Sequence, residues 1–205
     1  MSTAAASDPE SLLLRARGGD GSALGALLEQ YRSYLTLLAR LQIRRRLQGK
    51  ADPGDLVQET FLAAHCHWGR FRGTSERELI AWLREILAAQ LGNLVRRYLG
   101  TRGRDVRLER PLVQELDQSS QCLEAGFIAP QSSPSQQAAR REQAVLLANA
   151  LEQLPPDYRE VLILRHLEGL SLPEVARRMG RTLDSVKKLW TRGLARLRVS
   201  LGGAS

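Results

Sequence analysis

A group of cationic and hydrogen-bonding side chains lies near the C-terminal end of the sequence, within residues 171–197. Lysine, arginine, serine and threonine at helical spacing can bind phosphate groups and base edges in the major groove of DNA. The side chains that share this face or border it are Arg181, Thr182, Ser185, Lys187, Lys188, Thr191 and Arg192. They predict a DNA-binding surface, and the alternative is a solvent-exposed face on an ordinary helical hairpin.

The residues around this face predict how it is positioned. Ala176 is small enough to let two helices cross, and Gly180 suits a turn that needs a positive φ. Thr182 follows that turn as a candidate N-cap. Val186 and Trp190 then begin an apolar stripe at helical spacing on the second helix. This spacing predicts a helix-turn-helix whose second helix presents the cationic face.

A second candidate surface is acidic, although it lies in a basic part of the chain. The run Asp52-Pro53-Gly54-Asp55 predicts the start of a helix, because a carboxylate cap is followed by an early proline. The cap and the polar face of this helix, at spacings of three, four and seven, comprise Asp52, Asp55, Gln58, Glu59 and Leu62. Carboxylates are poorly suited to DNA, so this face favours a protein partner, with a plain solvated face as an equal alternative.

Two further groups of side chains suit single-stranded nucleic acid. Residues 69–74 form a short loop with two arginines around an aromatic residue, and Ser75 with Glu78 predicts a capping box that begins the next helix. The end of that helix is cationic. Bases can stack on aromatic rings while arginines follow the backbone, although positive charge is favourable at any helix C-terminus. The candidate residues are Arg70, Phe71, Arg72, Asn93, Arg96, Arg97 and Tyr98.

Charge is distributed unevenly along the 205 residues, whose net charge is +8. Residues 1–110 hold 18 Lys and Arg against 12 Asp and Glu, and residues 139–205 hold 12 against 7. The segment 111–138 between them holds three acids and no Lys or Arg. Two basic blocks favour a polyanionic partner for each. Leucine-rich helical periodicity with few β-branched runs predicts an all-α protein.

The sequence predicts neither an enzyme nor a cofactor or metal site. In His65-Cys66-His67, neighbouring side chains on a helix point about 100° apart and cannot close on one ion. No spacing in the sequence predicts a pair of catalytic carboxylates or a nucleophile next to a general base. Charges interrupt every hydrophobic stretch, which predicts no membrane insertion and a cytoplasmic location.

The predicted organisation has four parts. Residues 1–10 are small and polar and predict a disordered lead-in. Residues 11–110 form a first helical domain and 138–205 a second one that contains the helix-turn-helix. Between them, the Ser-, Gln- and Pro-rich stretch 111–137 predicts a flexible linker.

Three segments of the chain, in this order, resemble sigma factors of RNA polymerase, in the two-domain extracytoplasmic-function group of the sigma-70 family. The segment that docks on the clamp helices of the largest polymerase subunit is similar to DPGDLVQETFLAAHCHWGRF. The promoter-melting and −10 segment is similar to WLREILAAQLGNLVRR. The −35-reading domain is similar to LPPDYREVLILRHLEGLSLPEVARRMGRTLDSVKKLWTRGLARLR. The resemblance covers residues 12–201 apart from the linker.

The resemblance implies a factor that binds core RNA polymerase and directs promoter-specific initiation, with 11–110 as region 2 and 138–205 as region 4. It assigns the acidic face to polymerase docking and the 70–74 loop to a base flipped from the melted −10 strand. Asn93, Arg96 and Arg97 would lie nearby on duplex or backbone, and the cationic face of 181–192 would contact the −35 groove. Ala89 and Leu189 stand where relatives commonly carry asparagine and a polar or basic residue.

The implied partners are core RNA polymerase and promoter DNA, both as duplex and as melted strand. The resemblance also implies that an anti-sigma factor can sequester the chain. The alternative function is a helix-turn-helix transcriptional regulator that acts without polymerase docking, in which 1–110 serve as a sensor or dimerisation domain. That alternative predicts duplex binding without polymerase and no preference for melted DNA.

Overall fold

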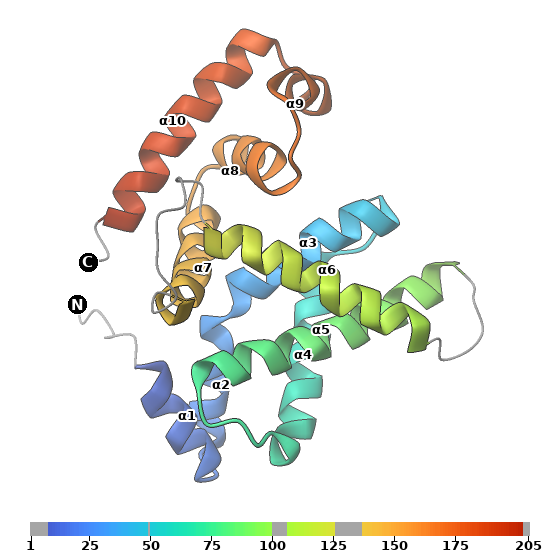
Figure 1. The fold of residues 1–205 in the computed structure, drawn as a ribbon, viewed down its shortest axis with the longest axis vertical. Helices are drawn as coiled ribbons and strands as arrows, with labels where there is room; N and C mark the ends of the chain where they lie inside the picture. Colours follow the sequence, from blue (N-terminus) through green and yellow to red (C-terminus); the bar gives the residue numbers. More distant parts are fainter. Residues whose placement is uncertain (1–7, 49, 100–105, 126–136, 203–205) are drawn as a thin grey trace. The chain divides into compact units, whose positions relative to one another are not determined.

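Residues 8–48, 50–99, 106–125 and 137–202 are described by the computed structural model of this chain (Figure 1). Within those ranges every regular element is helical, so the prediction of an all-α protein is confirmed for them. The chain divides into two compact units, Met1–Asp117 and Gln118–Ser205. The predicted domains 11–110 and 138–205 each fall inside one of these units.

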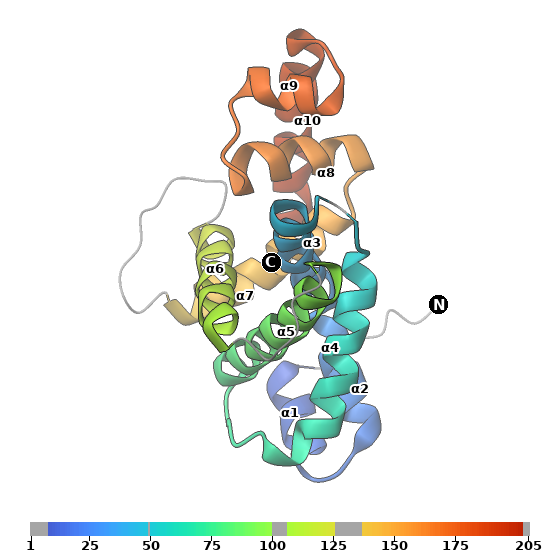
Figure 2. The ribbon, with the colours of Figure 1, turned by 90° about the vertical axis from the view of Figure 1, so that its right-hand side faces the viewer.

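The first unit is built from helices that pack around a leucine-rich core. Helix α1 packs on α2, α3 packs on α4, and α4 packs on α5 (Figure 2). Leu27, Leu35, Leu38, Leu83 and Leu87 are fully buried between them. The elements are α1 Pro9–Arg17, α2 Gly21–Gln30, α3 Arg32–Leu47, α4 Pro53–His67, the 3-10 turn η1 Trp68–Arg70 and α5 Glu76–Leu99.

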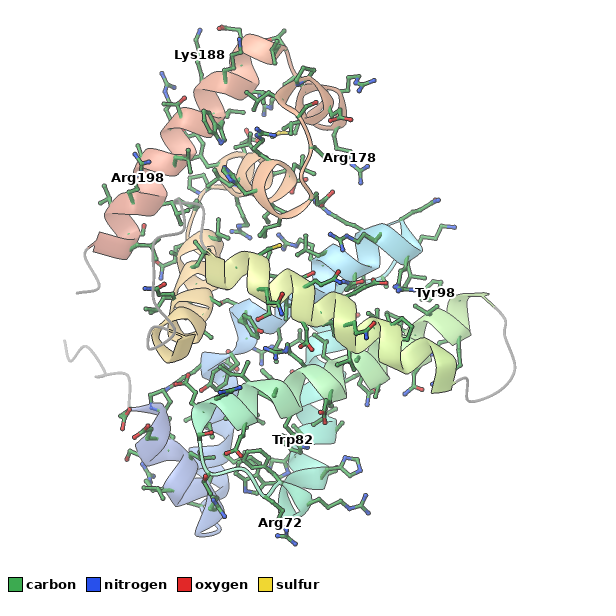
Figure 3. All side chains as sticks on the ribbon, in the orientation of Figure 1. Arg72, Trp82, Tyr98, Arg178, Lys188 and Arg198 are labelled. Carbon is green, nitrogen blue, oxygen red and sulfur yellow. The ribbon has the colours of Figure 1, made fainter. Side chains whose placement is uncertain are left out.

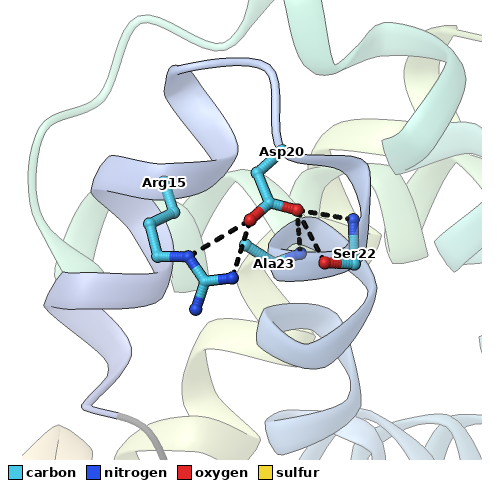
Figure 4. A network of polar contacts seen from close by, with 4 residues as sticks. All are labelled: Arg15, Asp20, Ser22 and Ala23. Carbon is cyan, nitrogen blue, oxygen red and sulfur yellow. Dashed lines mark hydrogen bonds and ion pairs between the residues drawn. The ribbon is translucent and has the colours of Figure 1, made fainter.

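Asp20 joins the end of α1 to the start of α2 (Figure 4). Its Oδ1 accepts hydrogen bonds from the backbone N–H groups of Ser22 and Ala23, both at 3.0 Å, and so caps α2. Its Oδ2 accepts from Nη2 of Arg15 at 2.7 Å. The hydrogen bond that Asp20 Oδ1 accepts from the Ser22 hydroxyl at 2.7 Å, with those from the Ala23 N–H and from Arg15, holds the pKa of Asp20 well below its usual range.

The second unit contains the helix-turn-helix. Helix α10 packs on α7, α8 and α9, and Gly193 of α10 allows a close approach to α8. A Cβ built on Gly193 would lie 3.4 Å from the carbonyl oxygen of Tyr158. Val161, Val175 and Val186 are fully buried in this unit. Its elements are α7 Gln137–Glu152, α8 Pro156–Leu162, the π-helical turn η3 Ile163–Leu167, α9 Leu172–Met179 and α10 Leu183–Gly202.

Helix α6, Val106–Ala125, corrects the prediction that residues 111–125 belong to a flexible linker. The buried leucines Leu112, Leu116 and Leu123 recur at spacings of four and seven, which places them on one face of a helix. Glu115 and Asp117 pair with Arg46 of α3 and Arg84 of α5, at 2.5 and 2.8 Å. Two acidic residues of this stretch therefore form ion pairs within the first unit.

The remaining predicted linker residues 126–136 lie outside the described residues. Of the predicted lead-in 1–10, residues 1–7 lie outside the described residues, and the prediction is wrong for Pro9 and Glu10, which belong to α1. Asp8 caps this helix by accepting a hydrogen bond from the backbone N–H of Ser11 at 3.3 Å.

Candidate functional site

The helix-turn-helix is confirmed, and local hydrogen bonds fix its shape. Ser171 and Glu174 form a capping box at the start of α9, in which Glu174 Oε2 accepts from Ser171 N at 2.7 Å. Gly180 has φ +62°, in the left-handed region that glycine adopts without strain. Thr182 then caps α10, since its Oγ1 accepts from the backbone N–H of Ser185 at 3.3 Å. These contacts set the angle at which α10 leaves the turn.

The exposed face of α10 carries most of the cations predicted for it. Lys187, Lys188, Thr191 and Arg192 are exposed, whereas Ser185 is half-buried. Lys188 Nζ lies 2.7 Å from Asp184 Oδ2, and its hydrogen bond lowers the pKa of that carboxyl. Figure 3 shows Lys188 and Arg198 projecting outward from this helix.

Other cations of the second unit have roles that the sequence did not reveal. Arg181 is half-exposed and pairs through Nη2 with Asp157 Oδ2 of α8 at 2.6 Å, so it also holds the turn against that helix. Arg178 of α9 and Arg198 of α10 are exposed, and both extend the positive surface beyond the predicted residues (Figure 3). The sequence pattern could have predicted that Arg198 belongs to the positive surface, because it lies on the same helix as the predicted cations.

A polar contact lies on the packed face of α10. Trp190 Nε1–H donates to Nε2 of His166 at 3.0 Å, and the two rings stack with centroids 6.3 Å apart. His166 lies in the π-helical turn η3, a type of irregularity that is frequent at functional positions. Burial, together with the charge of Arg165, lowers the pKa of His166, which favours the neutral ring that accepts this bond.

The acidic face lies on α4, as predicted. Asp55 and Gln58 are exposed, Glu59 is half-buried, and Leu62 exposes 59% of its surface. Asp52 also has a structural role, because its Oδ1 accepts from the backbone N–H groups of Gly54 and Asp55 at 2.6 and 3.2 Å and so caps α4. A single exposed leucine is common on protein surfaces, and beside carboxylates it is also compatible with a protein partner that offers apolar and basic groups.

A groove of ≈370 Å³ brings this acidic face next to the cationic end of α5. Asp55 and Glu59 lie on one wall, and Arg97 and Tyr98 lie on the other. Tyr98 also donates its hydroxyl hydrogen to the carbonyl oxygen of Lys50 at 2.9 Å, which ties the end of α5 to the segment before α4. Two candidate surfaces that are separate in the sequence thus share one groove.

The loop at 70–74 exposes its two arginines and buries its aromatic residue. Arg70 and Arg72 are exposed, and Figure 3 shows Arg72 at the outer edge of the loop. The sequence predicts a DNA contact at Phe71, but this residue is only 8% exposed and its ring packs on Trp68 and Trp82, with centroids 5.2 and 5.0 Å away. A base cannot stack on this ring without displacing a tryptophan, so we reassign Phe71 to the interior of the loop.

The cationic end of α5 has its own hydrogen-bonded pair. Asn93 is exposed, and its Oδ1 accepts from Nη2 of Arg96, which is half-buried. Its Nδ2 donates to Oε1 of Gln90 at 3.5 Å, the upper limit of a hydrogen bond. Arg97 and Tyr98 are exposed. The residues predicted here therefore share one end of α5, with Asn93 held in a fixed orientation by Arg96.

Family comparisons match both units. The model for "Sigma-70 region 2" matches residues 30–104, and the model for "Sigma-70, region 4" matches residues 144–197. The chain belongs to the sigma-70 family, in its extracytoplasmic-function group. In this sigma factor the acidic face, the loop and the end of α5 lie in region 2, and the helix-turn-helix lies in region 4.

Individual relatives carry the same family description. The ECF RNA polymerase sigma factor BldN of Streptomyces coelicolor is 31% identical over 186 residues, which are 91% of this chain and 63% of BldN. The ECF RNA polymerase sigma-E factor of Escherichia coli K12 is 28% identical over 178 residues, which are 86% of this chain and 85% of that protein. A chain in a solved structure of CnrH in complex with the cytosolic domain of CnrY has 26% identity and a TM-score of 0.34, with coverage of 97% of this chain and 100% of the matched chain.

Metal binding and membrane crossing each require a recognisable feature of the fold. Among the residues that the structure describes, no three His, Cys, Asp or Glu side chains come together in a way that could hold a metal ion. In the same part of the chain, no helix is both long and apolar enough to cross a membrane.

Proposed function

We propose that this sigma factor binds core RNA polymerase and directs promoter-specific transcription initiation in the cytoplasm. The observation that carries the proposal is the combination, in one chain, of an exposed acidic face in region 2 with a cationic helix-turn-helix in region 4. The first suits a protein partner and the second suits duplex DNA. The polymerase carries out the chemistry, and this chain makes and breaks no bond.

Polymerase docking is assigned to Asp55, Gln58, Glu59 and Leu62 of α4. Three of them are exposed polar or apolar side chains, and Glu59 lies within the groove. Carboxylates around an exposed leucine would bind a partner helix that offers basic side chains and an apolar one. Asp52 contributes by capping α4 and by the negative charge that it adds to the same groove.

Binding of the −10 element is assigned to the 70–74 loop and to the end of α5. Arg70 and Arg72 would bind the phosphates of a melted strand, with the loop backbone receiving an unstacked base. Asn93, Arg96, Arg97 and Tyr98 would lie on the adjoining duplex or backbone. We call residues 70–74 the capture loop. Its aromatic residue, Phe71, supports the loop from within.

Binding of the −35 element is assigned to the exposed face of α10 and the turn before it. A helix whose N-terminal side chains are cationic or hydrogen-bonding can enter the major groove while phosphate contacts fix its register. Because both DNA-binding modules belong to one chain, binding of one raises the effective concentration of the other. An anti-sigma factor that blocks these surfaces stays a prediction of the family resemblance.

A charge-reversal experiment tests polymerase docking. The double variant Asp55→Arg/Glu59→Arg should abolish binding to core polymerase, because it replaces two carboxylates of the acidic face with guanidinium groups. The matched control Glu10→Arg/Glu85→Arg makes the same change in charge at two other exposed positions of the first unit. Far-UV circular dichroism must show folded protein for both. Equal binding by the two variants would refute the docking assignment.

An in vitro transcription experiment tests the function as a whole. Core polymerase without a specificity subunit should begin RNA synthesis at defined positions of a promoter library only when this chain is added. A helix-turn-helix regulator that does not dock on polymerase would bind duplex DNA but give no new start sites. The absence of new start sites on a broad library therefore counts against the proposal and favours that alternative.

A further inference from the structure

Two hydrogen bonds join the last turn of α1 to the capture loop and the turn before it. Arg17 donates from Nη1 to the carbonyl oxygen of Gly73 at 3.0 Å. Trp68 donates from its indole Nε1 to the carbonyl oxygen of Ala16 at 3.1 Å. One bond holds the end of the loop and the other holds η1, which leads into it. Helix α1 lies outside the segment matched by the region 2 family model, which begins at residue 30.

Helix α1 is itself firmly placed. Leu12, Leu13 and Ala16 are each no more than 3% exposed, and α1 packs on α2 and α5. Burial of three apolar side chains on one face fixes both the position and the rotation of a helix this short. A hydrogen bond from Arg17 therefore connects the loop to a rigid part of the first unit.

The next peptide of the loop is held by a residue of α5. Glu78 of α5 accepts hydrogen bonds through Oε2 from the backbone N–H groups of Thr74 and Ser75, at 2.8 and 3.1 Å. These bonds lower the pKa of Glu78, so its carboxylate stays ionised and remains an acceptor. The carbonyl of Gly73 and the N–H of Thr74 are thus fixed by two different helices.

The interior of the loop leaves little freedom between these points. The Phe71 ring packs on Trp68 and Trp82, and it also lies against Gly73, where a built Cβ would come within 2.6 Å of Phe71 Cε2. These contacts restrict the backbone between η1 and α5. Arg70 and Arg72 remain exposed along this segment and can contact a ligand.

We propose that α1 is a positioning element for the capture loop, and that Arg17 is the positioning residue through its bond to the Gly73 carbonyl. This inference rests on the proposed capture of a −10 base by the loop. A loop that already has its bound shape loses less conformational entropy when the base enters. A hydrogen bond from a charged donor is stronger than a neutral one, which makes Arg17 an effective brace. Arg17 acts on the protein backbone and requires no DNA contact.

The test compares Arg17→Ala with Arg15→Ala. Both changes remove one positive charge from α1, and Arg15→Ala also breaks the ion pair with Asp20, but only Arg17 contacts the loop. Polymerase reconstituted with the full chain is bound to fork DNA whose −10 non-template bases are replaced, one at a time, by abasic nucleotides. For wild-type protein, the affinity for DNA that is abasic at the captured position should be much lower than the affinity for intact DNA. In Arg17→Ala the ratio of these two affinities should be smaller by about three- to tenfold, the effect of one hydrogen bond.

The outcomes separate the inference from the proposed function. If the wild-type complex shows no base preference at any −10 position, base capture by the loop is wrong. If wild type shows the preference and Arg17→Ala retains it as fully as Arg15→Ala does, the positioning role is overturned. A uniform loss in Arg17→Ala, shared by duplex −35 DNA and by polymerase binding, also overturns it, because a local brace acts at one base position.

Two more variants make the test independent of any folding defect in Arg17→Ala. Arg17→Lys retains a cationic donor and should restore part of the base preference. Trp68→Phe removes the indole N–H that bonds to Ala16 but keeps a ring against Phe71, so it should weaken the same base preference. An unchanged preference in Trp68→Phe, in protein that melts like wild type, would contradict the role of α1.

Discussion

Substituting Gly73 by alanine tests whether the capture loop has the tightly packed interior seen in the structure. A Cβ at this position would lie 2.6 Å from Cε2 of the Phe71 ring and 2.8 Å from the Cβ of Glu78. Carbon atoms in favourable contact are about 3.5–4.0 Å apart, so something must move by about 1 Å. Glu78 is held by the capping box, and the ring is therefore the group that must shift.

The expected loss in the free energy of unfolding follows from the contacts that the Phe71 ring would lose. Phe71 makes two aromatic contacts, with Trp68 and Trp82, and each such pair contributes about 0.5–1.5 kcal/mol beyond the burial of its area. Overfilling a packed interior typically costs about 1–3 kcal/mol. We therefore expect Gly73→Ala to lower the free energy of unfolding of the first unit by about 2 kcal/mol. For a unit of this size, the Tm should fall by roughly 5–10 °C.

Urea and thermal unfolding, followed by far-UV circular dichroism and tryptophan fluorescence, measure this change. Gly69→Ala is the matched control, because a Cβ built there meets nothing within 4 Å and the residue lies in the same exposed segment. The control should be neutral or slightly stabilising, since alanine reduces the entropy of the unfolded chain. If Gly73→Ala and Gly69→Ala unfold within about 0.5 kcal/mol of each other, the packing argument is wrong.

Three further predictions concern the second unit. The double variant Lys188→Ala/Arg192→Ala should bind −35 duplex more weakly than wild type does. The magnitude of the slope of log affinity against log salt concentration should fall by roughly one for each phosphate that is no longer bound. If titrations at several salt concentrations give an unchanged slope, neither side chain contacts phosphate. Gly180→Ala should lower the free energy of unfolding by about 1–2 kcal/mol in urea denaturation, because its φ of +62° is unfavourable for alanine. The pKa of His166 is lowered by burial, so the unfolded chain binds its proton more readily and stability is lost as the pH falls below the ordinary histidine pKa of about 6.5. Urea unfolding of the full chain between pH 8 and pH 5, followed by far-UV circular dichroism, should show this loss in wild type, and His166→Gln should reduce it.

Local chemistry explains which parts of the site could be predicted from the sequence. The cap at Asp52, the boxes at Ser75 and Ser171 and the turn at Gly180 each depend on residues within a few positions of one another. The exposed face of α10 follows from helical period alone. In each case the physical cause of the structure lies inside the segment that shows the pattern.

The features that the sequence did not predict depend on distant partners. Phe71 is buried because Trp82, eleven residues later, covers it, and Arg17 reaches a carbonyl 56 residues away. The contact between Trp190 and His166 joins residues 24 positions apart and depends on a π-helical turn that no residue type predicts. Helix α6 was missed because the stretch 111–137 is rich in serine and proline, which disfavour helix interiors, whereas buried leucines and two ion pairs decide the structure here.

Helix α6 has a consequence for the promoters that this chain can serve. Because α6 takes up the first half of the expected linker, only eleven residues, 126–136, separate it from α7. A fully extended chain of eleven residues spans at most roughly 40 Å. Each base pair added to the spacer between the −35 and −10 elements moves one element by about 3.4 Å and rotates it by about 35° around the DNA axis. We therefore expect a narrow range of accepted spacer lengths, so that promoter choice depends on the distance between the two elements as well as on their bases.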